Sequence, residues 1–436
     1  MFKTLGSAFK NREIRKKILI TLLLLLIYRL GCYLPVPGLE PSVYADAVNS
    51  ESGTGILSLL NAVTGSALAN GAFFALGVTP YINASIIVQL LTYGIPALER
   101  LSKQGDEGKQ KISLITKIVS LVLATAQGVG IVLGFGTDLL SPIFGEDLVW
   151  LTAIFVVVSL VAGTSLTMWI GDRITEQGVG NGLSLIIFIG ILSTTGQSLT
   201  NSIVNIFNGV TSAIWELLGF LAMVFVVFVL IVFFDLAERK IPVQYAKQVK
   251  GRKMYGGQSS HIPLKVNASG VLPIIFATAI ITFPNLIMQL CGYTAESGWF
   301  AKFYYEYIGA GGVIYSILVG VLILFFSYFY AQMQFSPTDV SLNIQQQGGF
   351  IPGIRPGKPT TEYLTKVSKR ITLFGAIFLA FIAIVPSIVF NYVAGGSLGL
   401  INAFTATGML IVVSVAIELN TQLEAQLMMK RHKNIL

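Results

Sequence analysis

The sequence predicts an all-α polytopic membrane protein with ten transmembrane helices in two inverted five-helix halves. Three observations predict this class. Hydrophobic residues make up 54% of the 436 residues and charged residues only 11%, whereas soluble domains usually carry about 25% charged residues. Apolar runs long enough to cross about 30 Å of hydrocarbon recur along the whole chain. The Lys and Arg residues fall in alternate gaps between these runs, as they do in cytoplasmic loops.

Ten segments are long and apolar enough to cross the bilayer. Their approximate bounds are residues 18–38, 56–97, 113–136, 148–171, 183–204, 213–236, 270–291, 308–331, 371–394 and 401–424. The first segment follows basic residues as a secretory signal would, but no small-residue cleavage pattern follows it, so we expect a retained helix. The spans divide near residue 208 into residues 1–207 and 208–436, with five spans in each part. An odd number per half makes the halves enter the membrane in opposite directions, and inverted repeats commonly place a transport pathway at their interface.

The positions of the basic residues predict the orientation of the chain. Of the 29 Lys and Arg residues, 27 fall in the two tails and in alternate gaps, leaving Lys302 on the opposite side and Arg29 within the first span. By the positive-inside rule, both termini are expected in the cytoplasm. This topology accounts for the net charge of +8, although such basic loops would also suit an anionic partner.

The second span is too long for a single crossing. It is interrupted by Gly65, Gly71 and Gly77. Residues 56–76 form a short half that is mildly polar and rich in small residues, and irregular backbone at membrane depth is tolerated only where protein or a water-filled cavity covers it. After this half, Thr79 is expected to cap a new helix with Pro80 at its first position. The polar residues of this helix would face a cavity or another helix, and ordinary packing by small and polar residues explains them equally well.

Isoleucines recur at helical spacing in two of the predicted helices. Ile82 and Ile86 share a face of the helix that follows Pro80, and Ile187 and Ile191 share a face of the helix that follows "GVGNG". Such a stripe usually belongs to a hydrophobic core. It would form a hydrophobic constriction only where stripes from several helices meet around an axis.

Two large loops, residues 235–269 and 332–370, lie on the predicted cytoplasmic side. They hold Gly and Pro at turn positions and short β-prone stretches, so we expect ordered protrusions with hairpin character. Their basic side chains suit RNA phosphates or an acidic protein face, with phospholipid headgroups as the alternative. The basic residues concerned are Arg239, Lys240, Arg252, Lys253, Arg355 and Lys358.

The sequence holds no recognisable catalytic or metal-binding pattern. Two cysteines and two histidines are too few for a disulfide framework or for a thiolate or imidazole metal site. The stretch "GIRPGKP" lacks the spacing of a phosphate-binding loop, because Pro352 and Pro359 occupy its first Gly position and its hydroxyl position. We therefore expect no enzyme, no cofactor and no metal. A secondary transporter is the alternative function, but it would usually bury ionisable residues, and the candidates Arg29 and Glu418 lie towards span ends.

Five stretches of the sequence resemble the SecY family, whose members form the centre of the bacterial protein-conducting channel. In chain order they read "GVTPYINASIIVQLL", "ITEQGVGNGLSLIIF", "ERKIPVQYAK", "GRKMYGGQSSHIPLKVN" and "GGFIPGIRPGKPT". The resemblance runs from the first span to the tenth. The chain departs from the family at "FSPTDVSLNIQQQ", where members more often carry basic residues before the Gly-Gly pair, and this departure concerns partner docking alone.

The resemblance implies an hourglass pore between the two halves, closed on the outside by the half-helix at about 56–76, which acts as a plug. It implies a pore ring at the narrowest point, formed by Ile82, Ile86, Ile187, Ile191, Ile275 and Ile411. A lateral gate would open between the second half of the second span and the seventh span, and its residues would include Asn83, Gln89, Thr278 and Ile281. The docking positions for a motor or a ribosome would be Arg239, Lys240, Lys250, Arg252, Lys253, Arg355 and Lys358.

The implied function is that of a channel that passes unfolded secretory polypeptides across the membrane and releases signal or transmembrane segments laterally into lipid. The implied partners are the small membrane subunits SecE and SecG, the SecA ATPase motor, the ribosome through its rRNA, the secretory preprotein with its signal peptide, and membrane lipids. The implied location is the inner or plasma membrane of a bacterium, which the chain would cross many times with both termini in the cytoplasm.

Overall fold

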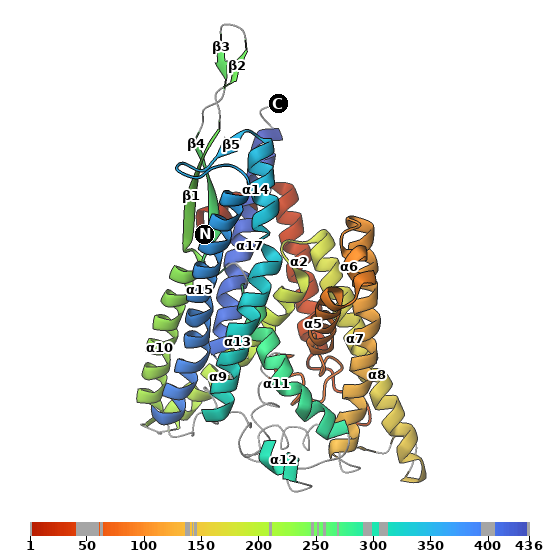
Figure 1. Ribbon diagram of the computed structural model, residues 1–436. Helices are drawn as coiled ribbons and strands as arrows, with labels where there is room; N and C mark the ends of the chain where they lie inside the picture. The colour runs from red at the N-terminus through yellow and green to blue at the C-terminus, as the bar shows by residue number, and fades with distance from the viewer. Residues whose placement is uncertain are drawn as a thin grey trace. The chain divides into compact units, whose positions relative to one another are not determined.

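The computed structural model describes most of the chain. The described residues are 2–40, 61, 64–135, 140–141, 143, 146–208, 212–245, 248–250, 253–255, 259–267, 270–290, 299–304, 313–393 and 406–433. Each predicted span contains a helix within its described residues (Figure 1). Seven of the described helices are long and apolar enough to cross a membrane, and the bent pair α5 (Thr79–Gly94) and α6 (Pro96–Ser102) adds an eighth. The predicted helical membrane class is confirmed, and this number is consistent with the ten predicted spans.

The chain folds into two compact units. Unit 1 comprises Met1–Leu221, Ala279–Tyr315 and Ser387–Leu436, and unit 2 comprises Ala222–Thr278 and Ser316–Pro386. These units reflect local compactness, whereas the division expected at residue 208 concerns an inverted repeat. That division therefore stays a prediction.

Unit 1 is built from helices. Besides α5 and α6 it contains α1 (Phe2–Lys10), α2 (Arg12–Gly31), α7 (Asp106–Phe135), η2 (Glu146–Leu148), α8 (Val149–Gln177), α9 (Gly182–Phe207), α12 (Trp299–Phe303) and α17 (Ala406–Lys433). The order of packing follows the chain, because α5 packs on α7, α7 on α8, and α8 on α9. α2 and α17 also contact α9. One apolar core of this unit includes Val36, Leu68, Val156 and Leu160, each at most 4% exposed.

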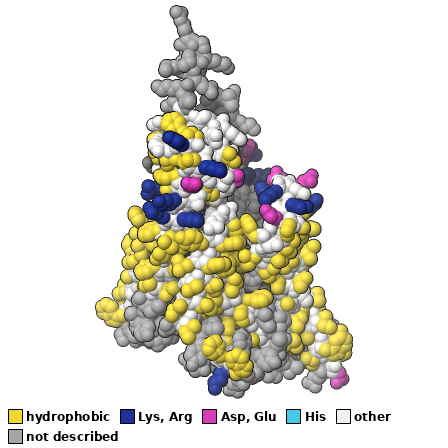
Figure 2. Space-filling view, viewed as in Figure 1, with side chains coloured by type: hydrophobic (Ala, Val, Ile, Leu, Met, Phe, Trp, Pro, Cys, Tyr) yellow, Lys and Arg dark blue, Asp and Glu magenta, His cyan; other side chains and the backbone are white. Residues whose placement is uncertain are grey.

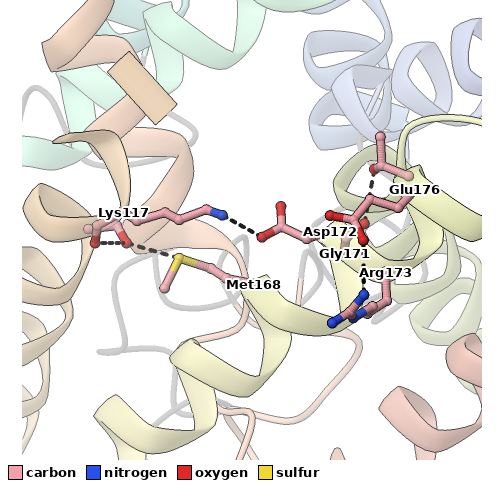
Figure 3. Close-up of polar contacts among 8 residues, drawn as sticks. Lys117, Met168, Gly171, Asp172, Arg173 and Glu176 are labelled. Atoms are coloured by element: carbon pink, nitrogen blue, oxygen red, sulfur yellow. Dashed lines mark hydrogen bonds and ion pairs between the residues drawn. The ribbon is translucent and has the colours of Figure 1, made fainter. Parts of the chain in front are cut away.

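Polar contacts tie α7, α8 and α9 together in addition to this apolar packing. Lys117 Nζ lies 2.6 Å from Asp172 Oδ2, so that an ion pair joins α7 to α8 (Figure 3). Met168 Sδ accepts a 3.0 Å hydrogen bond from a serine hydroxyl of α7. The hydroxyl of Thr175 accepts a 2.9 Å hydrogen bond from the backbone N–H of Gly182, the first residue of α9. Because the N–H groups of a first helical turn lack helical partners, this contact fixes where α9 begins.

Unit 2 combines helices with a small sheet. The helices α10 (Ser212–Asp235), α11 (Leu272–Leu290), α13 (Val313–Gln334) and α15 (Lys358–Val393) lie partly in it, and α14 (Pro337–Gln346) lies wholly in it. The strands are β1 (Glu238–Tyr245), β2 (Gln248–Lys250), β3 (Lys253–Tyr255), β4 (Ser259–Lys265) and β5 (Gly349–Phe350). A three-stranded sheet has the order β4-β1-β5, and β2 pairs with β3 further along the same hairpin (Figure 1).

The hairpin predicted in the loop 235–269 is confirmed. β1 and β4 pair antiparallel, with Glu238 opposite Lys265 and Gln244 opposite Ser259. Ile241 and Val243 of β1 point into an apolar core that also holds Leu364 of α15, so alternate residues of β1 hold the hairpin onto its unit.

The expected hairpin character of the loop 332–370 is wrong for most of that loop. Within this loop α13 ends at Gln334, α14 and the two-residue strand β5 follow, and α15 begins at Lys358. β5 pairs with β1. The physical reason is local, because Ser336 caps α14 by accepting a hydrogen bond from the N–H of Asp339, and Pro337 follows at the first helical turn.

Candidate functional site

Within the described residues of unit 1, the stretch 65–78, which leads into α5, has an irregular backbone. It consists of turns, with positive φ angles of 71° at Gly65, 68° at Ser66, 56° at Gly71 and 53° at Gly77. A right-handed helix cannot contain such angles. The half-helix expected over 56–76 is therefore wrong for residues 65–76, and most of the part before them lies outside the described residues.

This turn segment, defined here as residues 64–78, is held on α2 and the residues after it by ring stacking and backbone hydrogen bonds. The rings of Tyr28 and Phe74 stack with centroids 5.4 Å apart. The N–H of Phe73 donates a hydrogen bond to the carbonyl of Leu34 at 2.9 Å, and the N–H of Val36 donates one to the carbonyl of Gly71 at 2.9 Å. These hydrogen bonds satisfy backbone groups that water would otherwise have to solvate at membrane depth.

Two helical glycines let the turn segment approach closely. A Cβ atom at Gly31 of α2 would collide with the ring of Phe74, and a Cβ atom at Gly163 of α8 would collide with the carbonyl oxygen of Phe73. The backbone of the segment therefore rests directly on α8. The expectation that protein covers this irregular backbone is met within unit 1.

The start of α5 differs from the expectation in one detail. Val78 is the N-cap residue, Thr79 is the first helical residue, and Pro80 follows it in the first turn. Thr79 therefore caps nothing, and its buried Oγ1 has no hydrogen-bond partner among the described residues. The left-handed conformation of Gly77 turns the chain one residue earlier than a Thr cap would require. By contrast, α9 begins at Gly182, within one residue of the start predicted after "GVGNG". The side chain of Asn181 caps it by accepting hydrogen bonds from the N–H groups of Leu183 and Ser184.

The isoleucines of the predicted pore ring lie on four different helices. Ile82 and Ile86 are on α5, Ile187 and Ile191 on α9, Ile275 on α11 and Ile411 on α17. Ile86, Ile187, Ile191 and Ile411 are buried, at 2% to 9% exposure, while Ile82 and Ile275 are half-buried. Ile275 belongs to unit 2 and the others to unit 1. The ring stays a prediction.

The residues of the predicted lateral gate lie on α5 and α11. Asn83 and Gln89 are half-buried on α5, and Gln89 Nε2 donates to Ser85 Oγ at 3.1 Å. On α11, the hydroxyl of Thr278 donates a hydrogen bond to the backbone carbonyl of Ile274, one turn earlier in the same helix. The carbonyl of Ile281 accepts a 2.6 Å hydrogen bond from the hydroxyl of Tyr304. Helix α11 passes from unit 2 to unit 1 between residues 278 and 279. The gate assignment likewise stays a prediction.

The predicted docking residues lie in the loops of unit 2. Arg239, Lys240, Arg355 and Lys358 are exposed. Lys240 Nζ lies 3.2 Å from the carboxylate of Glu238. Lys250 and Lys253 stand on β2 and β3 at the far end of the hairpin, and Arg252 lies outside the described residues. Figure 2 shows Lys and Arg side chains gathered near the strands of this unit, beyond the hydrophobic side chains of its helices.

The base of the hairpin is closed by a hydrogen bond. Asn267, which follows β4, donates from Nδ2 to Asp235 Oδ1 at 2.7 Å, and Asp235 is the last residue of α10. The N–H of Val266 also donates to the carbonyl of Ala237. These hydrogen bonds join the two ends of the loop 235–269 next to α10. The exposed basic residues of the hairpin therefore extend from a base that hydrogen bonds hold in place.

Comparison with known proteins identifies the family. The family model described as SecY matches residues 72–420. The protein translocase subunit SecY of Streptomyces galbus is 39% identical over 447 residues, which cover 100% of both chains. The chain belongs to the SecY family.

Solved structures support the same fold. The structure described as that of a protein-conducting channel covers 94% of this chain and 92% of its own, with a TM-score of 0.66 and 20% identity. Sec61 in the canine ribosome–channel complex from the endoplasmic reticulum covers the same shares, with a TM-score of 0.62 and 19% identity. At such low identity these likenesses concern the fold, and the relatives that share the whole length of the chain are described as protein translocase subunits.

Sequence reasoning missed the side chains that hold the turn segment. Arg29 donates to the carbonyl of Gly65, and Ser66 donates to Gln197 of α9. One signal was available, because Arg29 is the only Lys or Arg between Lys17 and Arg100. The partners could not be predicted from the sequence, because Arg29 and Gly65 are 36 positions apart and Ser66 and Gln197 are 131 positions apart.

Proposed function

We propose that this protein is the channel-forming subunit of a protein translocase. It passes unfolded secretory polypeptides across the membrane and releases signal or transmembrane segments sideways into lipid. The observation that carries the proposal is the turn segment, an irregular stretch that is rich in glycine and fits between membrane helices before α5. A packed transmembrane bundle has no need of such a segment, whereas a channel needs a part that can close the path and move.

The physical basis of transport is differential solvation. We propose that Ile82, Ile86, Ile187, Ile191, Ile275 and Ile411 form a short apolar collar, with water on either side of it. Isoleucine offers no hydrogen bonds to hold a passing polar chain. A hydrophobic signal helix would instead leave past Asn83, Gln89, Thr278 and Ile281, because about 25 cal/mol per Å² favours its burial in lipid.

The proposed partners follow from the loops and the family. Arg239, Lys240, Arg355 and Lys358 are exposed cations, and Lys250 and Lys253 lie on β2 and β3 with Arg252 between them in the sequence. We propose that these residues bind the rRNA of a ribosome or an acidic face of the SecA motor. A solved relative is described in a ribosome–channel complex, which supports the ribosome as a partner. SecE and SecG are proposed as small membrane subunits of the same complex.

We further propose that the chain resides in the plasma membrane of a bacterium with both termini in the cytoplasm, and that it catalyses no reaction itself. The distribution of 27 of its 29 basic residues supports this orientation. Lacking a nucleotide site in its sequence, the chain would take its driving force from a partner.

Reconstitution tests this function against a secondary transporter. The purified protein, with its small subunits, is placed in liposomes with a SecA motor, ATP and a radiolabelled secretory precursor. We expect the precursor to become protected from added protease only when motor and ATP are both present. Solute uptake driven by an ion gradient without motor or ribosome, together with no protected precursor, would support the transporter instead.

A further inference from the structure

Arg29 is unusual because it is a cation inside the first predicted span. Its Nη1 donates to the carbonyl oxygen of Gly65 at 2.6 Å, and its Nη2 donates to the hydroxyl of Tyr33 at 2.8 Å. The guanidinium carbon also lies 4.7 Å from the centre of the Tyr33 ring. No carboxylate among the described residues pairs with this charge. Its partners are therefore the dipole of a backbone carbonyl and one aromatic side chain.

The same carbonyl belongs to a turn that α9 also holds. The hydroxyl of Ser66 donates to Gln197 Oε1 at 2.8 Å, and Gln197 Nε2 donates back to the hydroxyl of Tyr33 at 3.3 Å. Arg29, Gly65, Ser66, Gln197 and Tyr33 thus form a closed ring of contacts. The ring joins the end of α2, the beginning of the turn segment and α9.

The backbone of this turn is in an unfavourable conformation. Ser66 has a φ of 68°, the only positive value of a residue other than glycine among the described residues. An L-residue with a side chain adopts this region at a cost, and surrounding contacts have to maintain it. At Gly65, a Cβ atom would lie 2.5 Å from Arg29 Nη1 and 3.1 Å from the Cα of Gly190 on α9. The position therefore has room only for glycine while Arg29 is bonded to it.

We infer that Arg29 and Gln197 are positioning residues that latch the turn segment in its seated position. They control how readily the segment leaves α2 and α9. The inference rests on the proposed function, in which this segment closes the channel. When the segment leaves, Arg29 loses the Gly65 carbonyl and Gln197 loses Ser66, so the latch opposes release. Hydrogen bonds to a charged group are stronger than neutral ones, so Arg29 is expected to contribute most of the effect.

The test compares Arg29→Gln and Gln197→Ala with a matched control, Arg173→Gln. Arg173 of α8 also bonds a neighbouring side chain, Glu176, at 3.0 Å and lies 5.6 Å from the ring of Trp169. Neither contact involves the turn segment. One readout is the ion conductance of the purified protein in planar bilayers without precursor. The other is the maleimide labelling rate of a cysteine placed at Ala69, within the segment, with the native cysteine background subtracted.

For Arg29→Gln we expect conductance and labelling rate to rise about tenfold, which corresponds to ~1.4 kcal/mol, with a smaller rise for Gln197→Ala and none for Arg173→Gln. A merely structural role of Arg29 would lower the yield of folded protein and leave both rates per folded molecule unchanged, and that result would overturn the inference. Gln197→Ala removes no charge, so it decides the question if Arg29→Gln fails to assemble. Unaltered protein that does not translocate a precursor would count against the proposed function, whereas normal translocation with unchanged rates in both variants would count against the latch alone.

Discussion

A close backbone approach between α8 and the turn segment gives a sharp prediction. Gly163 of α8 lies directly on the carbonyl of Phe73, where an added Cβ atom would collide with the oxygen and lie 2.9 Å from the carbonyl carbon. The carbonyl cannot easily move, because the N–H of the same residue bonds to Leu34. We therefore expect Gly163→Ala to push the turn segment off α8.

The magnitude follows from overpacking of the seated state, which costs about 1–3 kcal/mol. The roughly 1 kcal/mol by which a helix interior favours alanine over glycine acts equally on the seated and the displaced state, so it does not change their ratio. The net cost to the seated segment is about 2 kcal/mol, which corresponds to a roughly thirtyfold rise in its displaced population.

Planar-bilayer conductance without precursor measures this population. The matched control is Gly196→Ala on α9, because a Cβ atom there meets nothing within 4 Å and should only strengthen the helix. We expect leakage to rise steeply for Gly163→Ala and to stay at the original level for Gly196→Ala. Equal leakage of the two variants would refute the reasoning that the segment rests on α8.

Three further predictions concern other parts of the chain. Replacing buried Ile86 with Ser should raise resting ion conductance, while the same change at Leu192, which is 47% exposed on α9, should not; equal conductance would count against the collar. Lys117→Ala should lower thermal stability in detergent by about 1 kcal/mol or less, because both members of its ion pair are partly exposed; a double-mutant cycle with Asp172→Ala that shows no coupling would contradict this. Arg355→Glu should weaken binding of SecA or the ribosome in co-sedimentation, and the loss should shrink at high salt; a loss independent of salt would indicate misfolding of the loop instead.

The parts of the fold that depend on local sequence were predictable. Periodic apolar runs predicted the positions of the helices, and "GVGNG" predicted the start of α9, because Asn181 caps the helix within three residues of its own position. The turn residues and short β-prone stretches of the loop 235–269 likewise predicted the hairpin that β1 and β4 form. Each of these features is decided by neighbours along the chain.

The parts that depend on distant contacts were not predictable. Glycine at positions 65, 71 and 77 indicated an interruption, but the left-handed conformation of Ser66 is maintained by Gln197, which is 131 positions away. The same holds for β5, whose two residues are a strand only because they pair with Gln244 and Tyr245. Helix α5 is capped at Val78, one residue before the predicted cap Thr79, and this start depends on the turn made by Gly77. A single sequence does not report such partners.

The central claim is that a polypeptide passes through the middle of this chain. A photoreactive residue at Ile86 tests it most directly, in protein reconstituted with a SecA motor or a ribosome and a radiolabelled secretory precursor stalled partway across. We expect a crosslink between residue 86 and the precursor that requires both the precursor and its driving partner, with no crosslink from a photoreactive residue at Leu192. Absence of a crosslink at residue 86, despite correct insertion and partner binding, would contradict the account.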